Sequence, residues 1–307
     1  MKTILVPLDG SALAEQVLPH VRLLAPLMSA SVQLLHVVSE ADRFHLLFDD
    51  VKQYGDAGRP LGREREWEIL RENGEEYLSE QAAKLRADGL EVGAEVLQGI
   101  APEAIVDAAE RSSACLIAMA SHGYGGLRRW ALGSVTDKVL HATRRPVLVV
   151  RGAKKPRPAP ALRKIMLPLD GSPLARKALP LAAELAGATR AELMLFSVAA
   201  PPVIETPESI IAYGEFDQAV AEMRGHLVEE LGPYAGELEE RGVKITPIAL
   251  SGGVAELIVD EAVVERVDLI VMATHGRSGL RRWALGSVAD KVLHASTTPL
   301  ILVNAHE

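Results

Sequence analysis

The stretch ASHGYGGLRRWALGSVTDKVLHATRRPVLVV at residues 120–150 returns as ATHGRSGLRRWALGSVADKVLHASTTPLILV at residues 273–303, with 21 identities in 31 aligned positions. A second repeated stretch lies near the start of each copy. ILVPLDGS at residues 4–11 returns as IMLPLDGS at residues 165–172. The offset is 161 at the start and 153 at the end, so the first copy has eight extra residues, which lie between Val38 and Asp88. The chain therefore contains one structural unit twice.

The repeat predicts two domains, over residues 1–151 and 164–307. Residues 152–163 contain proline and basic residues, a composition typical of an extended linker. The whole chain of 307 residues is 48% apolar and 24% charged, as expected for globular domains that each bury a core. A net charge of −8 argues against nucleic acid as a partner.

The single cysteine, Cys115, excludes an intrachain disulfide and a thiolate metal cluster. It lies in an apolar run, where we interpret it as a small buried hydrophobic residue. The N-terminal sequence shows no signal-peptide pattern, and no apolar run reaches the ~18–20 residues of a membrane helix. We therefore expect a cytoplasmic protein with no membrane partner.

Short β-branched runs alternate with longer helical patterns, which is typical of βαβ units around a parallel sheet. The first copy predicts strands over 3–7, 32–38, 92–97, 115–120 and 147–150, and helices near 11–28, 64–87, 102–111 and 134–143. The second copy predicts strands near 164–168, 191–198, 243–250, 268–273 and 299–303. The predicted fold is α/β, with two tandem doubly wound five-stranded parallel-sheet domains.

Several helix boundaries carry local signals. Ser11 is a predicted N-cap, Pro102 belongs to a first helical turn, and Ser134 after Gly133 opens the last helix of the first copy. Pro19 and Pro180 fall inside the first predicted helix of each copy, where we expect them to produce a kink.

Two unusual segments of each copy follow predicted strands, where an open parallel sheet binds its ligands. In the first copy Asp9 ends the first strand, HGYGG at residues 122–126 follows the fourth, and Gly133 precedes the last helix. Glycines allow close backbone approach and a helix N-terminus favours anions, so these segments suit a phosphate chain. The alternative is that the glycines only form tight turns and Ser134 only caps its helix.

Other site patterns are missing from the sequence. No P-loop, dinucleotide-binding, nucleophile-elbow or metal-site motif occurs, so the sequence predicts no catalytic residue and no metal ligand. His122 and His275 adjoin the glycine-rich loops, where each contacts a ligand or organises its loop by a hydrogen bond.

Three patterns of this chain resemble those of the nucleotide-binding universal stress proteins. They are the motif Gly-x2-Gly-x9-Gly-Ser/Thr after strand four, the Pro-x-Asp-Gly/x-Ser turn after strand one and the Pro-Val-x-Val-Val last strand. The resemblance covers nearly the whole chain, twice. In this chain Ala120 and Ala273 stand where the family has its first glycine. Alanine keeps the backbone N–H and is tolerated where φ need not be positive.

The resemblance implies a Rossmann-like, adenine nucleotide alpha hydrolase-like sheet of order 3-2-1-4-5 that holds ATP, or ADP or AMP, with or without Mg²⁺. It places the matching aspartates and valine backbones at the adenosine and the matching glycines and serines at the phosphates. The candidate nucleotide-binding residues are Asp9, Val37, Ala120, Gly123, Gly126, Gly133, Ser134 and Val135, and Asp170, Val198, Ala273, Gly276, Arg277, Gly279, Gly286, Ser287 and Val288.

The apolar last strands, at 146–150 and 299–303, would be aggregation-prone edges if left exposed. The resemblance implies that such strands pair across a dimer interface, so we expect a pseudo-twofold pair of domains within one chain. Further association into a homodimer stays open.

Three functions fit the sequence. The first is an adenine-nucleotide-binding stress-response protein in which the nucleotide is a structural or regulatory ligand. The second is a slow metal-dependent ATPase that uses Asp9 or Asp170 with arginines near the glycine loops. The third is a nucleotide-free interaction module.

Arg277 occupies the position of Tyr124, which predicts tighter phosphate binding by the second copy.

Overall fold

The computed structural model describes residues 2–44, 62–121, 133–152, 160–199, 218, 220–223, 225–227, 229–232, 234–275 and 285–304. These residues form two compact units. Unit 1 contains the described residues up to 121, with 133–145 and Gly152; unit 2 contains 146–151 and the described residues from 160 onward. In this part of the chain, no helix is both long enough and apolar enough to cross a membrane.

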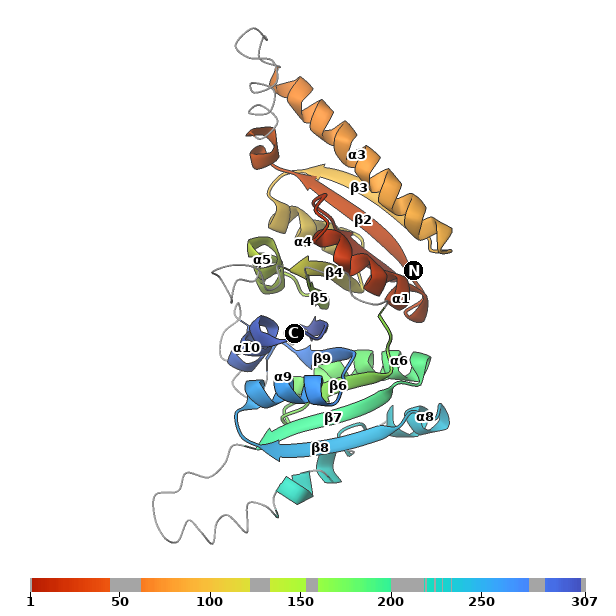
Figure 1. The fold of residues 1–307 in the computed structure, drawn as a ribbon, viewed down its shortest axis with the longest axis vertical. Coiled ribbons are helices and arrows are strands. Elements are labelled where there is room, and N and C mark those ends of the chain that lie inside the picture. The colour runs from red at the N-terminus through yellow and green to blue at the C-terminus, as the bar shows by residue number, and fades with distance from the viewer. Residues whose placement is uncertain are drawn as a thin grey trace, which may run out of the picture. The chain divides into compact units, whose positions relative to one another are not determined.

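Unit 1 alternates strands and helices as the sequence predicts (Figure 1). Its elements are β1 (Lys2–Pro7), a 3₁₀ turn (Ala14–Val17), α1 (Leu18–Leu27), β2 (Ala30–Val38), α3 (Arg63–Ala87), β3 (Val92–Gln98), α4 (Ala101–Arg111), β4 (Leu116–Ser121) and α5 (Ser134–Ala142). The strands lie in the order β3-β2-β1-β4 and every pair is parallel. The next strand, β5 (Val147–Arg151), groups with unit 2.

Unit 2 repeats this succession. Its elements are β6 (Lys164–Pro168), a 3₁₀ turn (Ala175–Ala178), α6 (Leu179–Thr189), β7 (Glu192–Ala199), α8 (Tyr234–Glu240), β8 (Ile245–Ser251), α9 (Val254–Val264), β9 (Leu269–Ala273), α10 (Ser287–Ala295) and β10 (Leu300–Val303). The order β8-β7-β6-β9-β10 is parallel throughout and is the predicted 3-2-1-4-5 order. The α/β fold class is confirmed.

The first strand of each unit lies inside the sheet, and the chain adds strands on one side of it before it adds strands on the other side. From β1 the chain builds outward through β2 and β3, then returns to place β4 on the other side of β1. Because parallel crossovers are right-handed, α1 and α3 cover one face of the sheet and α4 and α5 cover the other. With both faces covered, the central strands are almost wholly buried; Ile4, Leu5, Ile165 and Met166 are 0% exposed.

The backbone confirms the repeat at the level of single residues. Among the described non-glycine residues, those with positive φ are Ser29, Ser113, Arg190 and Arg266. Ser29 corresponds to Arg190 at the offset of 161, and Ser113 corresponds to Arg266 at the offset of 153. Glycines with positive φ pair in the same way at 10 and 171, 89 and 242, and 99 and 252. Both copies therefore use the same turns, as well as the same elements.

The predicted kinks at Pro19 and Pro180 are wrong. In each unit a 3₁₀ turn comes first, and the α-helix begins at Leu18 or Leu179, with the proline in its first turn. A first-turn residue has no N–H partner within the helix, so proline fits there without breaking a hydrogen bond. Pro102 and Ser134 lie in the first turns of α4 and α5, as predicted.

Candidate functional site

The candidate site of each unit begins at the turn after the first strand. The Asp9 carboxylate accepts a hydrogen bond from the Ser11 N–H at 3.0 Å, and the Ser11 hydroxyl oxygen accepts one from the Ala14 N–H at 3.1 Å. Gly10 has φ +82°, a conformation in which a side chain would be strained. The turn is therefore held locally, with the carboxylate at the carboxyl end of β1.

The same turn recurs after β6. The Ser172 N–H donates to Asp170 at 2.9 Å, the Ala175 N–H donates to the Ser172 hydroxyl at 3.1 Å, and Gly171 has φ +78°. The two serine hydroxyls therefore hold the start of a 3₁₀ turn, but its N-cap residues are Leu13 and Leu174, so the N-cap predicted at Ser11 is two residues too early. Both copies build an identical carboxylate-bearing turn at the switch point of the sheet, where doubly wound proteins bind ligands.

The last helix of each unit begins at the same edge of the sheet. Gly133 and Gly286 are the N-cap residues of α5 and α10, and neither helix has a side-chain cap. The first intrahelical bonds run from the N–H of Asp137 to Gly133 and from that of Asp290 to Gly286. The N–H groups of the first turn have no partner inside the helix, so they and the helix dipole suit an anion.

Gly286 is required by a close approach. Its N–H donates to the carbonyl oxygen of Thr274 at 2.8 Å, and a Cβ at this position would lie 2.9 Å from that oxygen. Its φ of −61° is open to any residue, so the constraint is the space between the end of β9 and the start of α10. This glycine brings the helix N-terminus against the strand.

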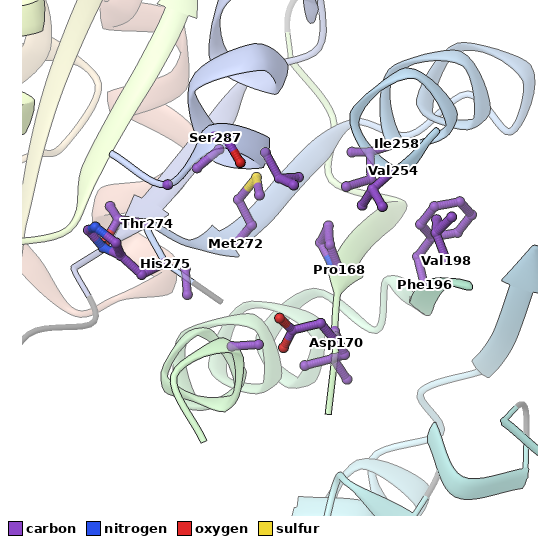
Figure 2. A pocket seen from close by; sticks show the side chains of 16 residues that line it. Pro168, Asp170, Phe196, Val198, Val254, Ile258, Met272, Thr274, His275 and Ser287 are labelled. Carbon is purple, nitrogen blue, oxygen red and sulfur yellow. The ribbon is translucent and has the colours of Figure 1, made fainter. Parts of the chain in front are cut away.

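A cavity of about 320 Å³ lies in unit 2 between these parts. Figure 2 shows side chains that surround it, from β6, β7, α9, β9 and α10. Six candidate residues of the second copy line it: Asp170, Val198, Ala273, Gly286, Ser287 and Val288. The structure therefore brings the carboxylate turn and the uncapped helix start to one space.

Unit 1 has the corresponding cavity, of about 160 Å³. It is lined by the six matching candidates: Asp9, Val37, Ala120, Gly133, Ser134 and Val135. Gly123, Gly126, Gly276, Arg277 and Gly279 lie outside the described residues, as do His122 and Tyr124. Their predicted contacts with a ligand stay predictions.

The two alanines that depart from the family motif cause no backbone conflict. Ala120 lies within β4 and Ala273 ends β9, and neither is among the described residues with positive φ. Alanine therefore adopts the backbone conformation that this position requires. Both residues also line their cavities.

Sequence reasoning missed the apolar wall of each cavity. In unit 2 it consists of Phe196, Val254, Ile258 and Met272; in unit 1 of Leu35, Ala101, Ile105 and Met119. A periodicity signal was present, because Phe196 and Val198 are two residues apart on a strand and share a face. Val254 and Ile258 are four apart on α9 and share a helix face. Each cavity therefore joins an apolar wall to a polar end, as small-molecule sites do.

His275 lines the cavity of unit 2, and its Nδ1 lies 3.1 Å from the hydroxyl of Thr274. Figure 2 shows both side chains at the same side of the cavity. The two alternatives for this residue, ligand contact and loop organisation, are thus compatible.

A polar contact beside the turn differs between the copies. In unit 1 the Tyr77 hydroxyl and the Gln81 amide donate to the Glu15 carboxylate at 3.1 and 3.3 Å. Burial and the negative charge of Glu15 raise the pKa of Tyr77 above its ordinary value. At the corresponding positions unit 2 pairs Arg176 with Glu230, 3.5 Å apart. Glu15 therefore meets two neutral donors beside its turn, whereas Arg176 meets a carboxylate.

Comparisons with known proteins agree with the two-copy architecture. The sequence profile of the universal stress protein family matches residues 1–151 and 161–304. The chain belongs to the universal stress protein family. Its two family domains together cover nearly all of its length.

Individual relatives match either the whole chain or about half of it. A universal stress protein of Mycolicibacterium smegmatis is 27% identical over 98% of this chain and 96% of its own length. The universal stress protein MJ0577 of Methanocaldococcus jannaschii is 36% identical over 49% of this chain and 94% of its own length. The crystal structure of a universal stress protein from Archaeoglobus fulgidus superposes with a TM-score of 0.70, at 20% identity, over 99% of this chain and 98% of that one. The tandem family fold thus occurs in a solved structure.

Proposed function

We propose that this universal stress protein binds adenine nucleotides, one in the cavity of each unit, and that the nucleotide is a structural or regulatory ligand. The observation that carries the proposal is the shared position of three features: an aspartate turn, an apolar wall and an uncapped helix N-terminus. An apolar wall suits a purine base, and a helix N-terminus suits a phosphate group. The family resemblance supports the same ligand.

Each residue set has a distinct part in this proposal. Asp170 and the Val198 backbone hold the adenosine, while Gly286, Ser287 and Val288 offer backbone N–H groups to the phosphates. Asp9, Val37, Gly133, Ser134 and Val135 do the same in unit 1. Gly123, Gly126, Gly276, Arg277 and Gly279 would complete the phosphate ends, and Mg²⁺ would accompany the nucleotide through its phosphates.

The cellular setting and the assembly are part of the same proposal. A single cysteine fits the reducing cytoplasm, where adenine nucleotides are available. The apolar last strand of each copy supports pairing of the two domains about a pseudo-twofold axis.

Thermal denaturation with and without ATP tests the binding. A ligand that binds only the folded state stabilises it, by about 2.7 kcal/mol when its concentration is 100 times Kd. For domains of this size that corresponds to a rise in Tm of about 5–10 °C. Small molecules released from the denatured purified protein are identified by mass spectrometry in parallel. Absence of released nucleotide together with an unchanged Tm in millimolar ATP would refute the proposal and favour a nucleotide-free interaction module.

Phosphate release separates a retained ligand from a hydrolysed one. Bound ATP recovered intact in stoichiometric amount supports the proposed role. Steady phosphate release that Asp170→Ala abolishes would instead show a slow ATPase.

A further inference from the structure

The two cavities differ in size although their linings correspond. The cavity of unit 2 measures about 320 Å³ and that of unit 1 about 160 Å³. Sites for small molecules in proteins measure about 300–1,000 Å³. The unit 2 cavity falls within this range as it stands, and the unit 1 cavity is half as large.

Residue size at corresponding positions does not explain the difference. Unit 2 has the larger side chain at two of these positions, Phe196 for Leu35 and Val254 for Ala101. It has the smaller one at Ala289, which corresponds to Thr136. The bulkier apolar wall belongs to the larger cavity, so the size of the wall residues does not make the unit 1 cavity smaller.

Leu13 is the side chain that distinguishes the described lining of the unit 1 cavity. It lines the unit 1 cavity, whereas its counterpart Leu174 does not line the unit 2 cavity. Their backbones are alike, with φ and ψ of −71° and −51° at Leu13 and −71° and −44° at Leu174. The two leucines therefore share a backbone conformation, and of the two only Leu13 lines its cavity.

The neighbour of Leu13 is Gly152. The Gly152 N–H donates to the carbonyl oxygen of Ser121 at 2.9 Å, which holds this residue next to the end of β4. A Cβ at Gly152 would collide with Cδ1 of Leu13, so Leu13 occupies the space that the missing side chain leaves. Leu13 thus extends from the aspartate turn to Gly152, next to the end of β4.

We propose that Leu13 is a steric gate on the unit 1 site, so that nucleotide fills the unit 2 site first and enters unit 1 only when Leu13 turns outward. This inference rests on the proposed function. Leu13 is partly exposed, so its side chain can rotate toward solvent. Apparent affinity falls by the fraction of molecules that are open; nine closed molecules to one open would weaken unit 1 binding about tenfold.

Calorimetric titration of the full chain with ATP tests this gate. The wild-type protein should give two binding phases, a tight one for unit 2 and a weaker one for unit 1. Leu13→Ala should tighten the weaker phase about fivefold to tenfold and leave the tight phase unchanged. Leu174→Ala is the matched control, because it removes the same atoms from a position that does not line the unit 2 cavity; both phases should stay within about twofold of wild type.

A second background isolates the unit 1 site. Gly286→Asp places a carboxylate at the phosphate end of unit 2 and removes the tight phase, so Leu13→Ala in that background reports on unit 1 alone. Two equal sites in the wild type, or a weaker phase that Leu13→Ala leaves unchanged, would overturn the gate while the proposed function stands. No ATP binding by the wild type in either phase would refute the proposed function and the gate with it.

Discussion

Gly286→Ala is the sharpest test of how α10 is placed against β9. The added Cβ would lie 2.9 Å from the carbonyl oxygen of Thr274 and 3.5 Å from Cα of His275. Relaxed carbon–oxygen contacts lie at ~3.3–3.6 Å, so the helix start must move by about 0.4–0.7 Å. The obstacle is backbone, which cannot rotate away as a side chain would. Since φ is −61°, the substitution adds no torsional strain, and its effect is steric.

The expected cost is that of overpacking a rigid contact, about 1–3 kcal/mol of folding stability. The shift also weakens the hydrogen bond from the Gly286 N–H to Thr274 and moves the N–H groups of Ser287 and Val288 away from the phosphates. Loss of one hydrogen bond to a charged group costs about 1.5–3 kcal/mol, so ATP affinity in unit 2 should fall at least about tenfold. The assay combines urea denaturation with calorimetric titration.

Gly236→Ala is the matched control for this substitution. Gly236 lies within α8, and a Cβ added there would have no heavy atom within 4 Å, so alanine should be neutral or stabilise by about 0.5–1 kcal/mol. Nucleotide affinity should not change. A Gly286→Ala protein as stable as wild type, with ATP affinity within about twofold, would refute the close-approach argument.

Two further substitutions test the local arguments. Ala273→Gly restores the family glycine; because this strand position needs no positive φ, we expect a loss of about 0.5–1 kcal/mol in urea denaturation and an ATP affinity within about twofold of wild type. A large gain in affinity would show that the alanine methyl obstructs the ligand. Tyr77→Phe removes the hydrogen bond to Glu15 and should cost about 1 kcal/mol, at the low end because the group is partly exposed to solvent. The pKa of Tyr77 is raised in the fold, so its contribution is complete below about pH 10 and lost as pH rises further. The stability difference between wild type and Tyr77→Phe, measured from pH 8 to 11, should therefore shrink above pH 10; a difference that grows there would contradict the assigned contact.

Much of the fold was predictable because its signals are local or repeated. Buried parallel strands are continuous apolar runs, and the observed strands begin and end within two residues of the predicted ones. The helix starts at Ser134 and at Pro102 followed from residue types that favour a first turn. The kinks at Pro19 and Pro180 were mispredicted because apolar periodicity does not distinguish a 3₁₀ turn followed by a helix from one continuous helix.

The sequence by itself determined that each copy carries an aspartate turn and a Gly-Ser helix start at one edge of a parallel sheet, because both follow strands whose carboxyl ends meet at that edge. Only the tertiary structure decided which apolar side chains, such as Phe196 and Met272, form the cavity wall, since they come from elements distant in sequence. It also decided that Leu13 lines its cavity while the equivalent Leu174 does not, and that two nearly identical motifs enclose cavities of about 160 and 320 Å³. Motifs specify backbone turns, whereas cavity volume depends on side-chain direction and on the space that a distant residue, here Gly152, leaves open.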